Sequence, residues 1–150
     1  MPEKAARAEE VRTFTTTGRA EPAAASRPQS VRESEAARQF AVACARIAAS
    51  DHCEDIVLLD LRGVSPICDF FVIATGTSDR QMRATCDHIE AMAREDGQRP
   101  YGTGGYDDGT WIVADYVDVV VHLFDAERRD YYDLESLWGD RPHIDWAESP

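Results

Sequence analysis

Residues 111–124 are almost continuously apolar, and their polar members are confined to Asp115, Asp118 and His122. As a single strand, this run would extend roughly 46 Å at ~3.3 Å per residue, longer than a domain of this size is wide. The chain must therefore fold back, and the break is expected where two aspartates flank Tyr116 and Val117. The pattern predicts a β-hairpin with a tight turn.

A two-residue connection at Tyr116 and Val117 would place Trp111 opposite His122 and Val113 opposite Val120. The predicted hairpin then has one wholly apolar face, made of Ile112, Ala114, Val119, Val121 and Leu123. The other face is mixed and consists of Trp111, Val113, Asp115, Asp118, Val120 and His122. The first is a core face, whereas the second either lies under a helix or presents a site.

The chain before the hairpin alternates between helical and strand patterns. Residues 30–50 predict a helix, with a capping box from Ser30 to Glu33 and a buried stripe of Phe40, Cys44 and Ile47. Residues 55–61 and 70–75 are short apolar runs without clean alternation, which is typical of strands in a sheet covered on both faces.

A second helix is predicted from Ser78, with Gln81 as its capping-box partner, to Gly97. Its buried stripe is expected to be Met82, Cys86, Ile89 and Ala93. Residues 99–106 predict a strand weakened by glycines, and residues 107–109 turn the chain into the hairpin.

A last helix should begin at the N-cap Asp125 and end at Gly139, with Tyr131, Leu134 and Trp138 on its apolar side. The complete order is helix-strand-strand-helix-strand-strand-strand-helix, which predicts an α/β fold with a mixed sheet.

Charge is unevenly divided along the chain. Residues 1–32 carry six basic and four acidic side chains, and residues 33–150 carry ten basic and 24 acidic ones; the net values of +2 and −14 give the total of −12. An acidic body is a poor general binder of nucleic acid and is better suited to a basic protein partner. The structural alternative is that the charge serves solubility alone.

Composition also suggests the limits of the domain. Residues 1–29 contain few large apolar side chains and predict a disordered extension; their glutamates argue against a transit peptide. Residues 30–140 are expected to form the domain and residues 141–150 a tail. The four cysteines have no paired spacing, so we expect reduced thiols and no metal site. The sequence has no apolar run of membrane length, so we expect no membrane segment and a cytoplasmic location.

Two strings, at residues 69–79 and 111–138, carry a specific resemblance. The first reads DFFVIATGTSD; the second contains WIV, an Asp-turn-Asp, VVVHLF and RDYYDLESLW. Over about residues 34–139 the chain resembles the ribosomal silencing factor family, also called the Iojap family. In this family the motif positions at the first string include Asp69, Gly76, Thr77 and Ser78.

The resemblance implies a translational repressor. Members bind the large ribosomal subunit through ribosomal protein L-fourteen, block joining of the small subunit when nutrients are short, and are often homodimers. It implies a nucleotidyltransferase-like core without catalytic carboxylates, and therefore no enzyme activity and no cofactor. The partner-binding residues that we carry over or infer from exposed aromatic character are Trp111, Asp115, Tyr116, Asp118, His122, Arg129, Tyr131, Tyr132, Glu135 and Trp138.

The chain departs from the family in the hairpin turn, where Val117 stands in place of the usual glycine. A β-branched residue is disfavoured at positive φ, so either a type I turn tolerates it or the turn is rebuilt and the register shifts. Gly104 and Gly105 likewise stand where Glu-Gly is usual.

Two catalytic alternatives remain open from the sequence. The glycine turn at residues 76–79 could cradle a nucleotide phosphate at a helix N-terminus, as in a nucleotidyltransferase-like enzyme. His122 with Asp115 or Asp118 could form a base and its orienting carboxylate, although a strand spacing of ~13 Å separates His122 from Asp118. A third possibility is a homodimer whose second copy covers the apolar hairpin face.

Overall fold

The computed structural model describes residues 31–138 and 141–147. The order of elements is the predicted one, with a short 3-10 helix added at the end. The elements are α2 (Val31–Ser50), β1 (Glu54–Asp60), β2 (Phe70–Thr75), α3 (Asp79–Glu95), β3 (Gly102–Gly104), β4 (Trp111–Asp115), β5 (Val119–Phe124), α4 (Ala126–Tyr132) and η1 (Leu134–Trp138). The predicted extension and the proposed caps Ser30 and Gly139 lie outside the described residues.

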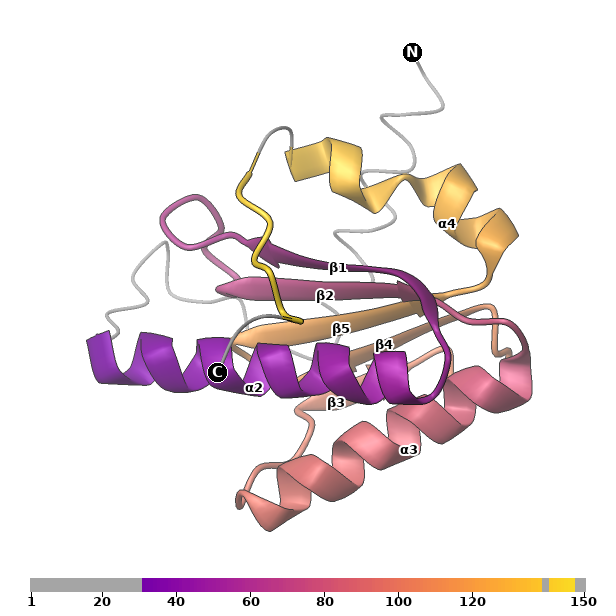
Figure 1. The fold of residues 1–150 in the computed structure, drawn as a ribbon, viewed down its shortest axis with the longest axis horizontal. Helices are drawn as coiled ribbons and strands as arrows, with labels where there is room; N and C mark the ends of the chain where they lie inside the picture. Colours follow the sequence, from indigo (N-terminus) through magenta and orange to yellow (C-terminus); the bar gives the residue numbers. More distant parts are fainter. Residues whose placement is uncertain (1–30, 139–140, 148–150) are drawn as a thin grey trace.

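The five strands form one mixed sheet in the order β1-β2-β5-β4-β3. β2 and β5 run parallel, and the other three pairs are antiparallel. Helices α2 and α3 cover one face, while α4 and η1 lie over the other (Figure 1). Every residue of β2, β4 and β5 is buried, which confirms a sheet covered on both faces. The strand predicted over residues 99–106 is limited to the three residues of β3.

Helix α3 begins and ends at residues that cap its backbone. The Ser78 hydroxyl accepts from the backbone N–H of Gln81 at 3.0 Å, as predicted, but the Gln81 side chain accepts from Thr77. At the other end, Gly97 adopts φ +75°, and Gln98 N–H reaches the Ala93 carbonyl in a Schellman motif. All four residues of the predicted stripe are buried.

The predicted register of the hairpin is wrong by two residues. Trp111 pairs with Phe124 and Val113 pairs with His122. The turn lies one residue later than expected, because Tyr116 N–H bonds to the Val119 carbonyl at 2.8 Å. Side chains alternate with a period of two, so a two-residue shift leaves both predicted faces intact.

Val117 is the residue that rebuilds this turn. Its φ is +74°, and Asp118 N–H bonds to the Tyr116 carbonyl at 2.9 Å, closing a three-residue turn around it. The Asp115 carboxylate accepts from Val117 N–H at 2.8 Å and holds the strained backbone. The valine side chain remains 42% exposed, so burial does not compensate for the strain.

The last predicted helix is interrupted. Asp125 is its N-cap as expected, and its carboxylate accepts from Arg128 N–H at 2.7 Å. However, Asp133 adopts a left-handed conformation with φ +46° and ends α4, after which the chain continues as η1. The break turns Leu134 into the core and leaves Tyr131 exposed, so the expected apolar side is only partly correct.

Replacing Val117 by glycine should raise the free energy of unfolding by about 1 kcal/mol, because glycine adopts positive φ without the steric strain of a β-branched side chain. Urea unfolding would measure the change. Val64→Gly is the matched control, since Val64 is also exposed but does not have positive φ, and it should give no gain. A destabilised Val117→Gly chain would contradict the assignment of strain.

Candidate partner-binding surface

An aromatic cluster fills the space between the sheet and the cover formed by α4 and η1. The ring of Trp111 stacks on Phe124 at 5.0 Å between centroids and contacts Tyr132 at 4.5 Å. Phe71 lies edge-on to His122 at 4.6 Å and to Trp138 at 5.7 Å. The mixed face of the hairpin is therefore buried under the cover.

His122 is fully buried in this cluster. The Trp111 indole N–H donates to His122 Nδ1 at 3.2 Å, so the neutral ring carries its proton on Nε2. Among the described residues, neither this Nε2 nor the Trp138 indole nitrogen has a hydrogen-bond partner. Burial lowers the pKa of His122 to about 3. A neutral imidazole that solvent cannot reach does not provide the general base considered above.

Arg129 fastens the cover to the sheet, and its side chain is only 12% exposed. Its guanidinium donates to the Asp55 carbonyl and, at 2.9 Å, to the Thr75 hydroxyl. Its Nε donates to the Glu135 carboxylate at 3.2 Å, across the break between α4 and η1. Two residues expected at a partner interface thus form an internal clamp.

The structure places four of the expected partner-binding residues in the interior. Both faces of the hairpin are covered within the chain, so these four side chains cannot contact a partner directly in this conformation. The buried residues are Trp111, Asp115, Tyr116 and His122. Tyr131 is 50% exposed, and five others are partly exposed. These five are Asp118, Arg129, Tyr132, Glu135 and Trp138.

The accessible part of the surface centres on Tyr131. Its ring lies edge-on to Tyr132 at 4.9 Å, and both line a shallow pocket on α4 with Glu127, Arg128 and Asp130. An exposed aromatic ring beside carboxylates suits a partner that presents both apolar and basic groups. The pocket presents two carboxylates, one guanidinium and two phenol rings.

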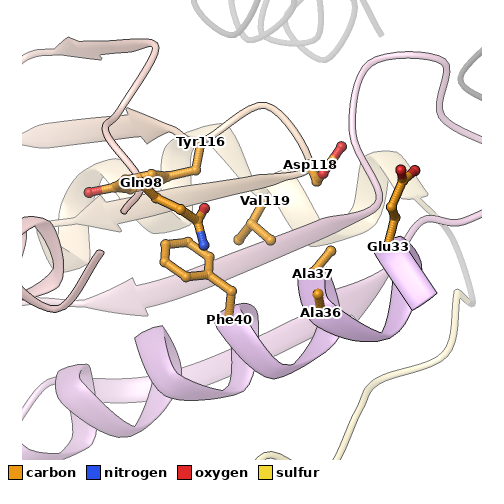
Figure 2. A pocket seen from close by; sticks show the side chains of 8 residues that line it. All are labelled: Glu33, Ala36, Ala37, Phe40, Gln98, Tyr116, Asp118 and Val119. Atoms are coloured by element: carbon orange, nitrogen blue, oxygen red, sulfur yellow. The ribbon is translucent and has the colours of Figure 1, made fainter. Parts of the chain in front are cut away.

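Tyr116 lies on the opposite face of the sheet, where its ring packs edge-on against Phe40 at 4.9 Å. Together they line a hollow of about 210 Å³ between α2 and the hairpin turn. Figure 2 shows the carboxylates of Glu33 and Asp118 on one side of this hollow and Gln98 beside the aromatic rings. Burial raises the pKa of the Tyr116 phenol, so it remains protonated.

The glycine turn at residues 76–79 is occupied by the chain's own groups. Gly76 N–H donates to the Phe124 carbonyl at 2.7 Å, Thr77 N–H to the Gln81 side chain at 2.5 Å, and Arg80 N–H to the Asp79 carboxylate at 2.8 Å. A Cβ on Gly76 would lie 2.1 Å from Met82 Cγ, so the glycine admits this side chain. Asp69, the other motif residue here, is buried.

Other reactive groups are also enclosed. All four cysteines are buried free thiols; burial raises the pKa of Cys44 and Cys53, and that of Cys86 to about 12. Within the described ranges, no three histidine, cysteine or acidic side chains group as metal ligands. No helix among these residues is long and apolar enough to cross a membrane.

Two long-range contacts had no signal in the sequence, one beneath this surface and one on the opposite face of the sheet. Phe71 separates His122 from Trp138, although its strand predicted only a generic core position. Asp51 is an acceptor for both Thr85 and His88 at 2.8 Å, and so ties the end of α2 to α3. Both contacts join segments distant in sequence, and local periodicity cannot reveal such contacts.

Comparison with known proteins gives consistent matches. Residues 34–150 match the family described as "Ribosomal silencing factor during starvation". The ribosomal silencing factor of Bacillus subtilis is 44% identical over 92 residues, which cover 61% of this chain and 78% of that protein. Chloroplastic protein Iojap of Arabidopsis thaliana is 32% identical over 109 residues, covering 71% of this chain and 44% of the relative.

The fold has a solved counterpart. The crystal structure of protein CV0518 from Chromobacterium violaceum superimposes with a TM-score of 0.64 at 32% sequence identity, and the match covers 71% of this chain and 87% of that one. The mixed α/β architecture is thus common to both proteins.

Acid should destabilise the fold through His122. Its pKa lies near 6.5 in an unfolded chain, so between pH ~6.5 and ~3 only the unfolded state takes up the proton. From pH 7 to pH 5, the free energy of unfolding should fall by about 2 kcal/mol more in the native chain than in His122→Asn. Urea titrations at both pH values would measure it. His52→Asn, at an exposed site, should keep the native pH dependence.

Removing the clamp should loosen the cover. Arg129→Ala removes the donor of the Glu135 carboxylate, the Asp55 carbonyl and the Thr75 hydroxyl, and should lower the free energy of unfolding by about 2 kcal/mol. Hydrogen exchange should then quicken in η1. Arg128→Ala is the matched control, because the neighbouring Arg128 is 43% exposed and forms its ion pairs with Glu127 and Asp125 at the surface. Equal effects of both substitutions would contradict the clamp.

Proposed function

The chain belongs to the ribosomal silencing factor family, and we propose that it represses translation by binding the large ribosomal subunit through ribosomal protein L-fourteen. Bound there, it sterically blocks joining of the small subunit when nutrients are limiting. It acts in the cytoplasm as a stoichiometric binder, and its effect follows from affinity and occupancy in competition with the small subunit.

We choose the surface of α4 because its Tyr131 side chain is exposed. It combines a large open ring with acidic neighbours Glu127 and Asp130, on a body whose residues 33–150 have a net charge of −14. Tyrosine contributes a large contact area at a low entropic cost, and the acidic field attracts a basic ribosomal protein. Beneath this surface or at its rim lie the partly exposed residues Tyr132, Glu135 and Trp138. Asp118 is also partly exposed, but it lies at the hairpin turn.

A non-enzymatic mechanism fits the site. The amides of Gly76, Thr77 and Arg80 bond within the chain, His122 is buried and neutral, and the thiols are enclosed. Steric exclusion needs shape and affinity, and it needs neither a nucleophile nor a cofactor. The alternative function is a nucleotide-binding enzyme that uses the turn at residues 76–79.

We also propose that the free protein is a homodimer, but its interface is not the apolar face of the hairpin. Ile112, Ala114 and Val121 belong to the apolar hairpin face, and all three are buried against α2 and α3 within the chain. A second copy therefore cannot cover that face, and copies must meet elsewhere.

The purified chain should co-sediment with separated large subunits and not with small ones, and it should reduce subunit joining. Tyr131→Ala should weaken binding about tenfold, because the residue is exposed and its loss removes contact area without disturbing the core. Sedimentation at physiological salt and magnesium, over a range of protein concentrations, would measure both effects.

Tyr101→Ala is the matched control for this substitution. Tyr101 is 51% exposed, close to the 50% of Tyr131, but precedes β3 instead of lying on α4. Equal weakening by both would remove α4 as the binding surface. Absence of co-sedimentation, together with a rise in melting temperature on adding ATP or GTP with Mg²⁺, would favour the enzyme over the binder.

A further inference from the structure

Two adjoining hollows of different charge lie between α2, the hairpin turn and the end of α3. The first, the acidic hollow, is the one of about 210 Å³ beside Tyr116; the second, the mixed hollow, measures about 350 Å³ and lies where α3 leads toward β3. Gln98 lines both. Burial raises the pKa of the Tyr116 phenol, and the charges of Glu90 and Arg94 also act on it, so the phenol lies near the mixed hollow. Tyr116 therefore reaches from one hollow toward the other.

The acidic hollow is shaped for a flat cation. Figure 2 shows the carboxylates of Glu33 and Asp118 at one end and the rings of Phe40 and Tyr116 along the wall. Carboxylates accept the paired N–H groups of a guanidinium, and aromatic rings suit its flat face. A carboxylate has about four acceptor positions, so the contacts that Glu33 and Asp118 make within the chain leave acceptor capacity for a ligand.

The mixed hollow carries both signs of charge. It is lined by two guanidinium groups, of Arg94 and Arg99, and by one carboxylate, of Glu90. Arg94 pairs with Glu90 at 3.5 Å, and Arg99 adds a second positive charge on a body that is strongly acidic. Guanidinium groups bind a carboxylate, and the Glu90 carboxylate binds an ammonium group. An α-amino acid presents these two groups on one carbon atom.

The sizes of the hollows restrict the ligand. Small-molecule sites commonly measure ~300–1,000 Å³, so the acidic hollow alone admits little more than one charged group. The phosphates of a nucleotide would be repelled by Glu33 and Asp118. A purely cationic ligand would leave the guanidinium of Arg99 without an anion. A small molecule with a cation at one end and a zwitterion at the other matches both hollows.

We propose that the two hollows together bind a free amino acid with a cationic side chain. The cation lies at Glu33 and Asp118, the alkyl chain packs along Tyr116, and the α-carboxylate lies at Arg99. Arginine is the amino acid whose flat cation fits the acidic hollow. This site does not depend on the proposed ribosome binding, because α4 and η1 contribute no residue to either hollow.

Arginine is the probe, and two of its relatives separate the contributions of its ends. Citrulline keeps the α-amino acid group but has a neutral urea group, and agmatine keeps the guanidinium but lacks the carboxylate. NMR titration of the isotope-labelled full chain at physiological salt should show saturable shifts of the Gln98 side-chain amide and of backbone amides at residues 36–40. Citrulline and agmatine should each bind on the order of tenfold more weakly, because each loses one ionic contact.

Substitutions test the two ends from the side of the protein. Glu33→Gln and Arg99→Gln should each weaken arginine binding on the order of tenfold. Glu35→Gln and Arg80→Gln are the matched controls, because they change the same charges outside both hollows and should leave the affinity unchanged. All four side chains belong to exposed residues, and circular dichroism would check that each variant is folded.

The absence of saturable shifts at millimolar arginine would overturn the site, as would shifts centred on Tyr131 and α4. Equal affinity for the three ligands would overturn the assignment of the two ends. If Glu35→Gln weakened binding as much as Glu33→Gln, general attraction by the acidic body would explain the binding, and the hollows would not be the site.

Discussion

The parallel pairing of β2 with β5 is the contact on which the remaining structure depends. It joins Phe70–Thr75 to Val119–Phe124, and both strands are apolar on both faces apart from Thr75 and His122. A parallel connection requires a crossover, which α3 provides on one face. With its central strands buried, the sheet cannot be stable with either side open, so the chain must supply two covering layers.

The two layers are built differently. On one face, α2 and α3 contribute long buried stripes with capped or tightly packed ends. On the other, α4 and η1 are short, and they depend on the Arg129 guanidinium reaching the sheet and Glu135. Under this thinner layer lie two donors, on His122 and Trp138, that have no hydrogen-bond partner among the described residues. The layer that presents the candidate binding surface is thus the less firmly fastened one.

The sequence predicted the order of elements and the buried stripes because these depend on local periodicity. The hairpin faces also survived a wrong register, since Val113 keeps its face whether it pairs with Val120 or with His122. The sequence left open whether Trp111 and Tyr116 are buried, because burial depends on which layer covers each face. The clamp from Arg129 to Asp55 spans 74 residues, and the left-handed break at Asp133 follows an otherwise helical pattern.

This arrangement restricts how a partner can be recognised. A partner that contacted Trp111 or His122 would first have to lift η1, which would break the Arg129–Glu135 contact and expose the aromatic cluster to water. That opening would subtract from the binding free energy. A partner that contacts Tyr131 leaves the clamp and the cluster in place. The buried motif residues of the hairpin therefore support α4 from below, and the exposed residues of α4 are the ones that the proposed contact would use.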